Sequence, residues 1–272
     1  MKSLGIATSL LCSSFLLAAC ASLPPFAAAP STPAGGYTVG GSPSFFPAPD
    51  SLHHFIDDRK EVLYFQNYGG GGVALGVLLG PIGVLANMSM IKSVTEDDAK
   101  QLHGMIPIDT VKVFQKYVPQ DQYLSSSRDV NGEGLLSPYL LVEKIDDEHF
   151  RCSALLIVDL NPAGTKWTRQ YMYELQDVYT KYQLTSGLSD SQLASLTADL
   201  GGGLQWAMAT YLLDAKGSFS PREKETIKSD FLTPRNQIPM TGYGYDAGPN
   251  RIGFATAAAV YSLSPDGVTI TK

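Results

Sequence analysis

The spacing of apolar residues changes from strand-like to helix-like between positions 139 and 212, and this change constrains the fold most strongly. Three strands are predicted first, at Tyr139–Ile145, Phe150–Leu160 and Lys166–Leu175. A capping box of Ser189 and Gln192 then predicts the start of a long helix. Its apolar positions recur at helical spacing, at Leu193, Leu196, Leu200, Leu204, Met208 and Tyr211 or Leu212. Because strands and helices come in runs, we expect an α+β fold, with an antiparallel meander covered by helices on one face.

The remaining segments add shorter elements to this plan. Gly201–Gly203 interrupt the long helix, which indicates close packing against the sheet or a kink. The other predicted elements are a strand at Glu61–Tyr68, a helix after Thr95, a helix at Asp109–Val118, a helix start at Ser220–Glu223, and a hairpin of Phe254–Leu263 with Val268–Thr271. We find no internal repeat.

The N-terminus carries the clearest localisation signal. Lys2 is followed by an apolar stretch, Leu4–Leu17, which is too short for a lasting membrane span but typical of a secretory signal. Leu17-Ala18-Ala19-Cys20 ends this stretch and resembles the lipobox of bacterial membrane lipoproteins. The resemblance implies cleavage between Ala19 and Cys20, acylation of Cys20, and, with Ala21 next, sorting to the outer membrane. An ordinary secretory signal is the alternative interpretation.

The sequence after the signal divides into a linker and a folded part. Residues 20–52 are rich in Pro, Ala, Ser and Gly and carry no charge before Asp50. Such a segment buries too little apolar surface to offset its ordering entropy, so we predict a disordered tether. With 1–19 as signal peptide, residues 53–272 are expected to form a single globular domain. That domain is expected to face the periplasm, with the cell surface as an alternative.

Charge and cysteine content exclude several classes of protein. The formal net charge is −6, and Lys and Arg form no cluster, so nucleic acid is not expected as a partner. Cys12 would leave with the signal and Cys20 would be acylated, so no disulfide framework can form. Cys152 lies in an apolar strand with His149 on the opposite face, which predicts an inert core thiol.

A glycine-rich apolar segment at residues 69–91 leaves two interpretations open. Gly72, Gly76 and Gly80 have the four-residue spacing of a glycine zipper and resemble motifs in outer-membrane lipoproteins that insert or oligomerise. Pro81 and Gly83 shorten the apolar run, which favours a buried loop-helix element. A phosphate-binding loop is a weak third interpretation, since no complete motif is present.

Signals for chemistry elsewhere are weak. His53 with Asp57, and His54 with Asp58, would face one another if that segment were helical, but a zinc site needs more ligands. We interpret Asp146–Glu148 as a solvated hairpin tip, and Gly242–Gly248 as a flexible aromatic loop that could line a ligand or partner surface. No G-x-S-x-G, S-x-x-K or H-E-x-x-H motif occurs. The sequence therefore predicts no catalytic residue, metal or cofactor.

Together these observations predict a lipid-anchored, non-catalytic envelope lipoprotein. Its expected partners are membrane lipid, through acylated Cys20, and another envelope protein in assembly, transport or maintenance. A membrane-inserting or pore-forming homo-oligomer built on the glycine zipper is the first alternative. A hydrolase or ligand-binding protein with a site spread over loops is the second.

Overall fold

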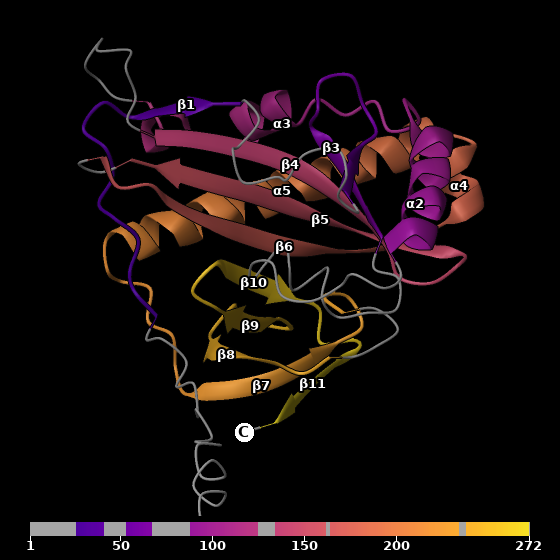
Figure 1. Cartoon of the computed structure of the whole chain (residues 1–272). Helices are drawn as coiled ribbons and strands as arrows, with labels where there is room; N and C mark the ends of the chain where they lie inside the picture. The colour runs from indigo at the N-terminus through magenta and orange to yellow at the C-terminus, as the bar shows by residue number, and fades with distance from the viewer. Residues whose placement is uncertain are drawn as a thin grey trace, which may run out of the picture.

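One mixed sheet organises the molecule, and helices cover one of its faces (Figure 1). The computed structural model describes residues 26–40, 53–66, 88–124, 134–161, 164–233 and 238–271. Within them the strand order is β11-β7-β8-β9-β10-β6-β5-β4-β3-β2, and β1 also pairs with β4. Neighbours are antiparallel except for the β1–β4, β3–β4 and β6–β10 pairs. The predicted α+β class is therefore confirmed.

The strands differ widely in length, and the longest ones form the centre of the sheet. Their bounds are β1 Tyr37–Val39, β2 His53–Phe55, β3 Val62–Gln66, β4 Gly134–Lys144, β5 His149–Leu160, β6 Trp167–Thr180, β7 Lys224–Ser229, β8 Met240–Tyr245, β9 Ile252–Ala255, β10 Ala259–Leu263 and β11 Val268–Thr271. The helices are α2 Met88–Leu102, α3 Thr110–Tyr117, α4 Lys181–Thr185 and α5 Asp190–Ala215, with a short 3-10 turn at Gln120–Gln122.

The central strands are buried on both faces, which corrects the expectation of a single covered face. On β6 the Tyr171 side packs toward the helices, as predicted, but Met172 on the opposite side is also buried. Figure 1 shows the strands from β10 to β11 lying below the layer of β4, β5 and β6. Residues from β7 to β10 share a second apolar cluster with β3–β6. The alternation of side chains along β6 shows which residues share a face, but it does not show that β7–β10 cover the second face.

Helix α5 forms as its sequence predicts. Ser189 and Gln192 make the reciprocal capping box, and the predicted apolar positions Leu196, Leu200 and Leu204 are buried. The helix continues through Gly201–Gly203 without a break. Close packing is present at two of these glycines, since an added Cβ would lie 2.5 Å from the Tyr117 ring at Gly201 and 2.6 Å from the Cβ of Ala154 at Gly203. Helix α3 is also confirmed, with Asp109 as its N-cap.

Two predicted helix starts were wrong. Helix α2 begins at Met88, so the acidic residues after Thr95 lie inside the helix rather than at its start. The Ser220–Glu223 signal does not start a helix, because the next residues form β7. The backbone N–H of Arg222 already donates to the carbonyl oxygen of Gly244 at 2.5 Å, so strand pairing begins where the helix was expected. Pairing on both sides of β7 outweighs the local helix signal.

The predicted C-terminal hairpin was also wrong in its pairing. Strands β10 and β11 are consecutive in sequence, and Gly267 does adopt a positive φ between them. However, β10 pairs with β9 and β6, while β11 pairs with β7 at the far end of the strand order. A turn sequence fixes the local reversal but not the partner strand. This topology leaves β11 at an edge of the sheet.

A buried ion cluster ties α2 and α4 to the sheet. The Asp98 carboxylate accepts from Lys144 Nζ at 2.7 Å, from Lys181 Nζ at 2.9 Å and from the Tyr64 hydroxyl at 3.1 Å. Burial alone would raise the pKa of Asp98, but the two lysines outweigh burial and lower this pKa below its ordinary value. The stability that Asp98 contributes is therefore present at neutral pH and lost as the pH falls through its folded pKa.

We expect Asp98→Asn to lower the free energy of unfolding at pH 7 by about 1–2 kcal/mol, since a neutral amide interacts more weakly with the lysines. The difference from wild type should shrink below pH ~4, where Asp98 of the unfolded chain becomes protonated. Urea unfolding at several pH values measures both effects. Asp97→Asn is the matched control, because Asp97 is 65% exposed and forms an ion pair with Lys100, one turn away on the same helix. A difference that is constant with pH would contradict the role given to Asp98.

Candidate functional site

The N-terminal part of the described chain is fixed to the domain by a buried charge pair. The backbone N–H of Ala29 donates to Asp214 Oδ1 at 2.9 Å, and Arg169 Nη2 donates to the carbonyl oxygen of Ala27 at 2.9 Å. Arg169 Nη1 lies 2.6 Å from Asp214 Oδ2, and both side chains are almost inaccessible to solvent, at 2% and 0% exposure. The Tyr171 hydroxyl donates to the same carboxylate at 2.6 Å. We call this arrangement the N-terminal clamp.

Aromatic side chains complete the N-terminal clamp. The Arg169 guanidinium lies over the Phe26 ring at 4.2 Å and near Trp167 at 5.1 Å. Further along the segment, the Tyr37 hydroxyl hydrogen-bonds to that of Tyr211 at 2.6 Å. Burial is the main cause that raises the pKa of Tyr37 and of Tyr171, so both phenols stay neutral.

The N-terminal clamp corrects the tether predicted for residues 20–52. Residues 26–40 lie on the domain, and Tyr37–Val39 pair with β4 as β1. Composition predicted a free linker because it counts few apolar residues, but Ala29 and Tyr37 are both buried. Residues 20–25 and 41–52 lie outside the described residues, as do Ala19 and Cys20 themselves.

The sequence analysis did not identify Arg169 and Asp214, the charge pair at the centre of the N-terminal clamp, although the position of each one in the apolar pattern indicates burial. Arg169 occupies an apolar position of β6, between Trp167 and Tyr171. Asp214 follows Tyr211 by three residues, on the apolar face of α5. Because a charged side chain is rarely buried unless it is paired, a charge of each sign at a core position predicts a buried ion pair.

A groove of about 970 Å³ lies where one end of several strands meets the surface. Described residues that line it come from the start of β7, the end of β8, the start of β9 and from β11: Arg222, Glu223, Lys224, Glu225, Gly244, Tyr245, Arg251, Ile252, Gly253 and Ile270. We call it the strand-end groove. The volume is within the range of ligand pockets, and the lining offers both signs of charge beside two isoleucines. Such a lining suits a polar or peptide-like partner.

Two aromatic contacts connect the strand-end groove to the N-terminal clamp. The Phe219 ring lies 5.3 Å from the Phe26 ring and 4.8 Å from that of Tyr245, which lines the groove. The Tyr245 hydroxyl donates to the carbonyl oxygen of Tyr261 at 2.7 Å, so this side chain is held in place. Phe219 therefore links Phe26 of the N-terminal clamp to Tyr245 of the strand-end groove.

Arg251 is the most constrained cation of the strand-end groove. Its Nε donates to Ser262 Oγ at 2.9 Å, its Nη2 to the carbonyl oxygen of Glu174 at 2.8 Å, and its guanidinium stacks on Tyr173 at 4.0 Å. Burial lowers the pKa of Arg251, while Tyr173, Glu174 and Tyr245 act in the opposite direction. Its Nη1 has no hydrogen-bond partner among the described residues.

The segment Gly242–Gly248 was interpreted as a flexible loop, and this was wrong for its first half. Residues up to Tyr245 form β8. A Cβ on Gly242 would lie 2.4 Å from the carbonyl oxygen of Ala255, so glycine is needed for the close approach of β9. Gly244 and Tyr245 line the strand-end groove, and the role of this segment as a ligand or partner surface stays a prediction.

The helical spacing that would place His53 above Asp57 and His54 above Asp58 is absent. Residues His53–Phe55 are a strand, and His53 and His54 oppose Phe65 and Tyr64 in its register, so helical spacing does not apply. Among the described residues, no group of three or more His, Cys, Asp or Glu side chains is placed to hold a metal ion.

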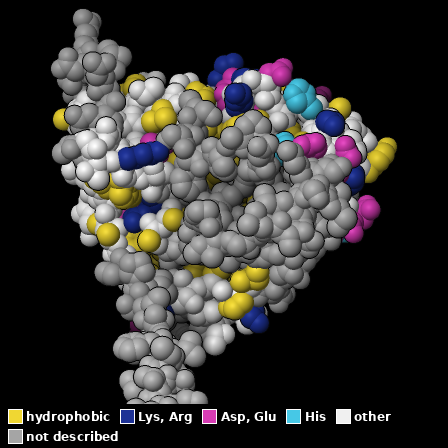
Figure 2. Space-filling model, viewed as in Figure 1, with side chains coloured by type: hydrophobic (Ala, Val, Ile, Leu, Met, Phe, Trp, Pro, Cys, Tyr) yellow, Lys and Arg dark blue, Asp and Glu magenta, His cyan; other side chains and the backbone are white. Residues whose placement is uncertain are grey.

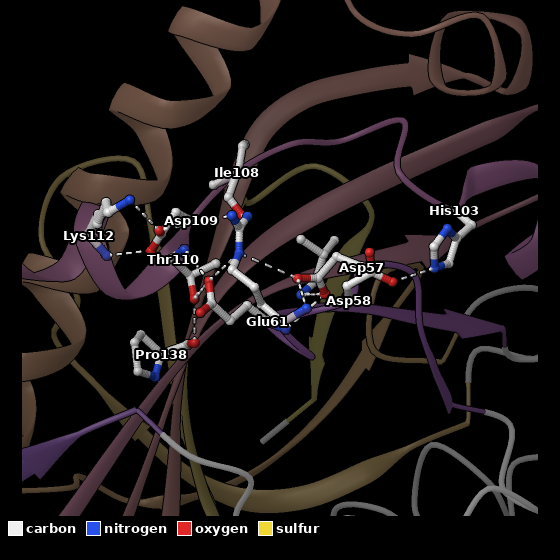
Figure 3. A network of polar contacts seen from close by, with 11 residues as sticks. Asp57, Asp58, Glu61, His103, Ile108, Asp109, Thr110, Lys112 and Pro138 are labelled. Atoms are coloured by element: carbon white, nitrogen blue, oxygen red, sulfur yellow. Dashed lines mark hydrogen bonds and ion pairs between the residues drawn. The ribbon is translucent and has the colours of Figure 1, made fainter.

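Figure 3 shows what the two aspartates do instead. Asp57 Oδ1 accepts from the backbone N–H groups of Glu61 and Val62, both at 2.8 Å, and so caps the turn before β3. Asp58 Oδ1 lies 3.4 Å from His103 Nε2 at the surface. Many of the charged side chains visible in Figure 2 lie over this region, from the upper centre to the upper right, where Figure 1 places α3 and α2.

Glu61 extends the same network to α3. Its Oε2 accepts from the backbone N–H of Thr110 at 2.8 Å, and the Thr110 hydroxyl donates to the carbonyl oxygen of Pro138 at 2.7 Å (Figure 3). Burial is the main cause that raises the pKa of Glu61, and the negative charges of Asp109 and Asp57 act in the same direction. The hydrogen bond from Thr110 and the positive charge of Arg59 lower this pKa but do not outweigh burial. Asp57 and Glu61 thus each satisfy backbone donors, which is a structural role.

The other candidates have plain outcomes. Cys152 is buried, and burial raises the pKa of its thiol to about 12, so the predicted inert core thiol is confirmed. Asp146–Glu148 do form the tip between β4 and β5, where Asp146 accepts from the backbone of His149. Gly72, Gly76 and Gly80 lie outside the described residues.

The chain matches no protein-family model, no curated protein and no solved structure. Among the described residues, no helix is both long and apolar enough to cross a membrane.

Proposed function

We propose that this protein is a lipid-anchored envelope lipoprotein that acts by binding a protein partner close to the membrane. The observation that carries the proposal is that the N-terminal clamp begins at Phe26, six residues after the lipobox Cys20. Six residues reach at most about 20 Å even when fully extended. An acyl group on Cys20 would therefore hold the clamped end of the domain near the lipid headgroups, rather than on a long leash.

This short connection also orients the domain. Phe26 contacts Phe219, which follows the C-terminal end of α5, whereas α4 precedes the other end of this helix (Figure 1). The 26 residues of α5 span about 39 Å. The strand-end groove would then lie at the membrane-proximal end, where a partner in the same membrane can reach it.

Acylation is tested by growing a bacterial host that produces the full-length chain in labelled palmitate. We expect label in the wild-type protein and recovery with the outer membrane. We expect neither in Cys20→Ser. Cys152→Ser is the matched control, since that buried thiol should not affect labelling. Label that persists in Cys20→Ser, or wild-type protein without label, would refute the anchor.

Orientation is tested with a fluorophore on Ser218→Cys or on Tyr182→Cys, both at exposed positions, in lipidated protein bound to vesicles that contain headgroup-quencher lipid. Cys152 should not react, because it is buried. We expect much stronger quenching at position 218, near the N-terminal clamp, than at position 182 in α4. Equal quenching would show that the domain is not held by a short connection.

A further inference from the structure

Strand β11 is an open edge of the sheet. It is the last strand in the order and pairs only with β7 among the described residues. Its residues, Val268-Thr269-Ile270-Thr271, are all β-branched, and none is charged. Natural edge strands are often protected by charges, proline, a bulge or a very short length; β11 is short, with four residues, but it carries no charge, proline or bulge. In Figure 1 it is the outermost strand, beyond β7.

The register shows which backbone groups of β11 point away from the sheet. The backbone N–H of Asp230 donates to the carbonyl oxygen of Gly267 at 3.0 Å, just before the strand begins. Since bonded and non-bonded residues alternate in an antiparallel pair, Thr269 and Thr271 bond to β7, whereas Val268 and Ile270 direct their groups outward. The Val268 N–H is already used by the carbonyl oxygen of Pro265, at 3.3 Å. The outward groups are the N–H and C=O of Ile270 and the C=O of Val268.

These groups lie at the surface. Thr269, Ile270 and Thr271 are exposed, and the Ile270 side chain keeps 41% of its area accessible while it lines the strand-end groove. The edge and the strand-end groove therefore form one continuous surface, in which backbone groups without a partner among the described residues lie beside a groove lined by charged and apolar side chains.

We propose that β11 binds an extended segment of a partner protein as an additional strand. The outward groups of Ile270 and Val268 supply main-chain hydrogen bonds, the usual source of affinity in strand addition. Side chains directly opposite each other pack together, and threonine can hydrogen-bond to threonine or serine across strands. The preferred segment therefore alternates apolar residues, beside Val268 and Ile270, with small polar residues beside the two threonines. The strand-end groove can accept a side chain of this segment next to Ile270.

A peptide segment fits this edge better than a second copy of the chain. Two copies that paired only through their four-residue β11 strands would bury far less than the roughly 1,000 Å² expected of a stable interface. A flexible segment can instead follow the edge and continue into the strand-end groove. This inference deepens the proposed binding function but does not depend on acylation of Cys20.

The test uses random eight-residue peptides displayed on phage and selected on residues 21–272. Synthetic versions of the selected peptides are then titrated by fluorescence anisotropy. We expect alternating apolar residues in the selected peptides, and at least tenfold weaker binding to Ile270→Pro. This change removes one outward N–H without breaking a hydrogen bond to β7, and edge strands tolerate proline. Leu213→Lys, at an exposed position of α5, is the control and should bind within twofold of wild type.

Two further measurements make the result independent of a folding defect. Thr271→Lys places a charge on the edge without altering the backbone and should also weaken binding. Hydrogen exchange of the Ile270 amide should slow at least tenfold in the wild-type complex. The proposal is overturned by unchanged binding to both variants, by an unprotected Ile270 amide, by failure to select any peptide, or by a dimer of the chain that Ile270→Pro abolishes. None of these outcomes would alter palmitate labelling, which tests the anchor separately.

Discussion

Replacing Asp214 with alanine is expected to lower the free energy of unfolding by about 3–5 kcal/mol, because the change leaves the Arg169 guanidinium buried without its partner. Asp214 accepts from three donors: the backbone N–H of Ala29, Arg169 Nη1 and the Tyr171 hydroxyl. No water can replace the carboxylate easily, since these side chains are almost inaccessible to solvent. The loss should therefore exceed that of an ordinary surface ion pair.

Urea unfolding of residues 21–272 measures this loss. Asp246→Ala is the matched control, because Asp246 also pairs with an arginine, Arg222 at 3.4 Å, but both side chains are largely exposed. Its cost should stay below about 1 kcal/mol. Similar costs for the two variants would contradict a central role for the Arg169–Asp214 pair.

The same variant tests whether the N-terminal clamp fixes residues 26–36. With the Asp214 acceptor gone, the hydrogen bond from Ala29 is lost, and the segment is held by β1, by the rings around Phe26 and by the hydrogen bond from Arg169 to the carbonyl oxygen of Ala27. We expect limited proteolysis to cut this segment at least tenfold faster in Asp214→Ala, while the rest of the domain stays resistant in native buffer. Unchanged cleavage would show that the aromatic contacts suffice.

Local patterns predicted elements well where each element depends on its own residues. The capping box at Ser189 and the N-cap at Asp109 were both found, since a cap involves atoms only a few residues apart. The predicted helix start at Ser220 failed for the complementary reason. The state of that segment is decided by β8 and β11, which lie later in the chain and compete with the local signal.

The candidate site shows the same division. The lipobox predicted where an anchor would be, but no local pattern showed that the chain is clamped a few residues later. That contact joins residues 185 positions apart, Ala29 and Asp214. Likewise, the strand-end groove depends on β11 lying beside β7, a pairing that the turn sequence before β11 does not encode. Of the strand-end groove, only the part formed by Gly244 and Tyr245 lies in a segment that the sequence analysis had singled out.

The three consecutive glycines of α5 should respond very differently to alanine, because only two of them touch a neighbour. A Cβ on Gly203 would lie 2.6 Å from the Cβ of Ala154 in β5, which is fixed by the sheet backbone. A Cβ on Gly201 would lie 2.5 Å from the Tyr117 ring of α3. Gly202 faces open space, because a Cβ on it would have no heavy atom of a neighbouring element within 4 Å. The glycines at 201 and 203 therefore set the distance of α5 from α3 and β5.

We expect Gly203→Ala to cost about 1–3 kcal/mol of stability, since the helix must move away from the sheet to admit the methyl group. Gly202→Ala should instead stabilise the protein by about 0.5–1 kcal/mol, because alanine loses less conformational entropy in a helix. Gly201→Ala should fall between them, as the partly exposed Tyr117 can shift more easily than Ala154. Urea midpoints of the three variants give this order directly. If Gly203→Ala were as stable as Gly202→Ala, close contact with β5 would not explain the glycines, and a kink or a site of flexibility would have to explain them instead.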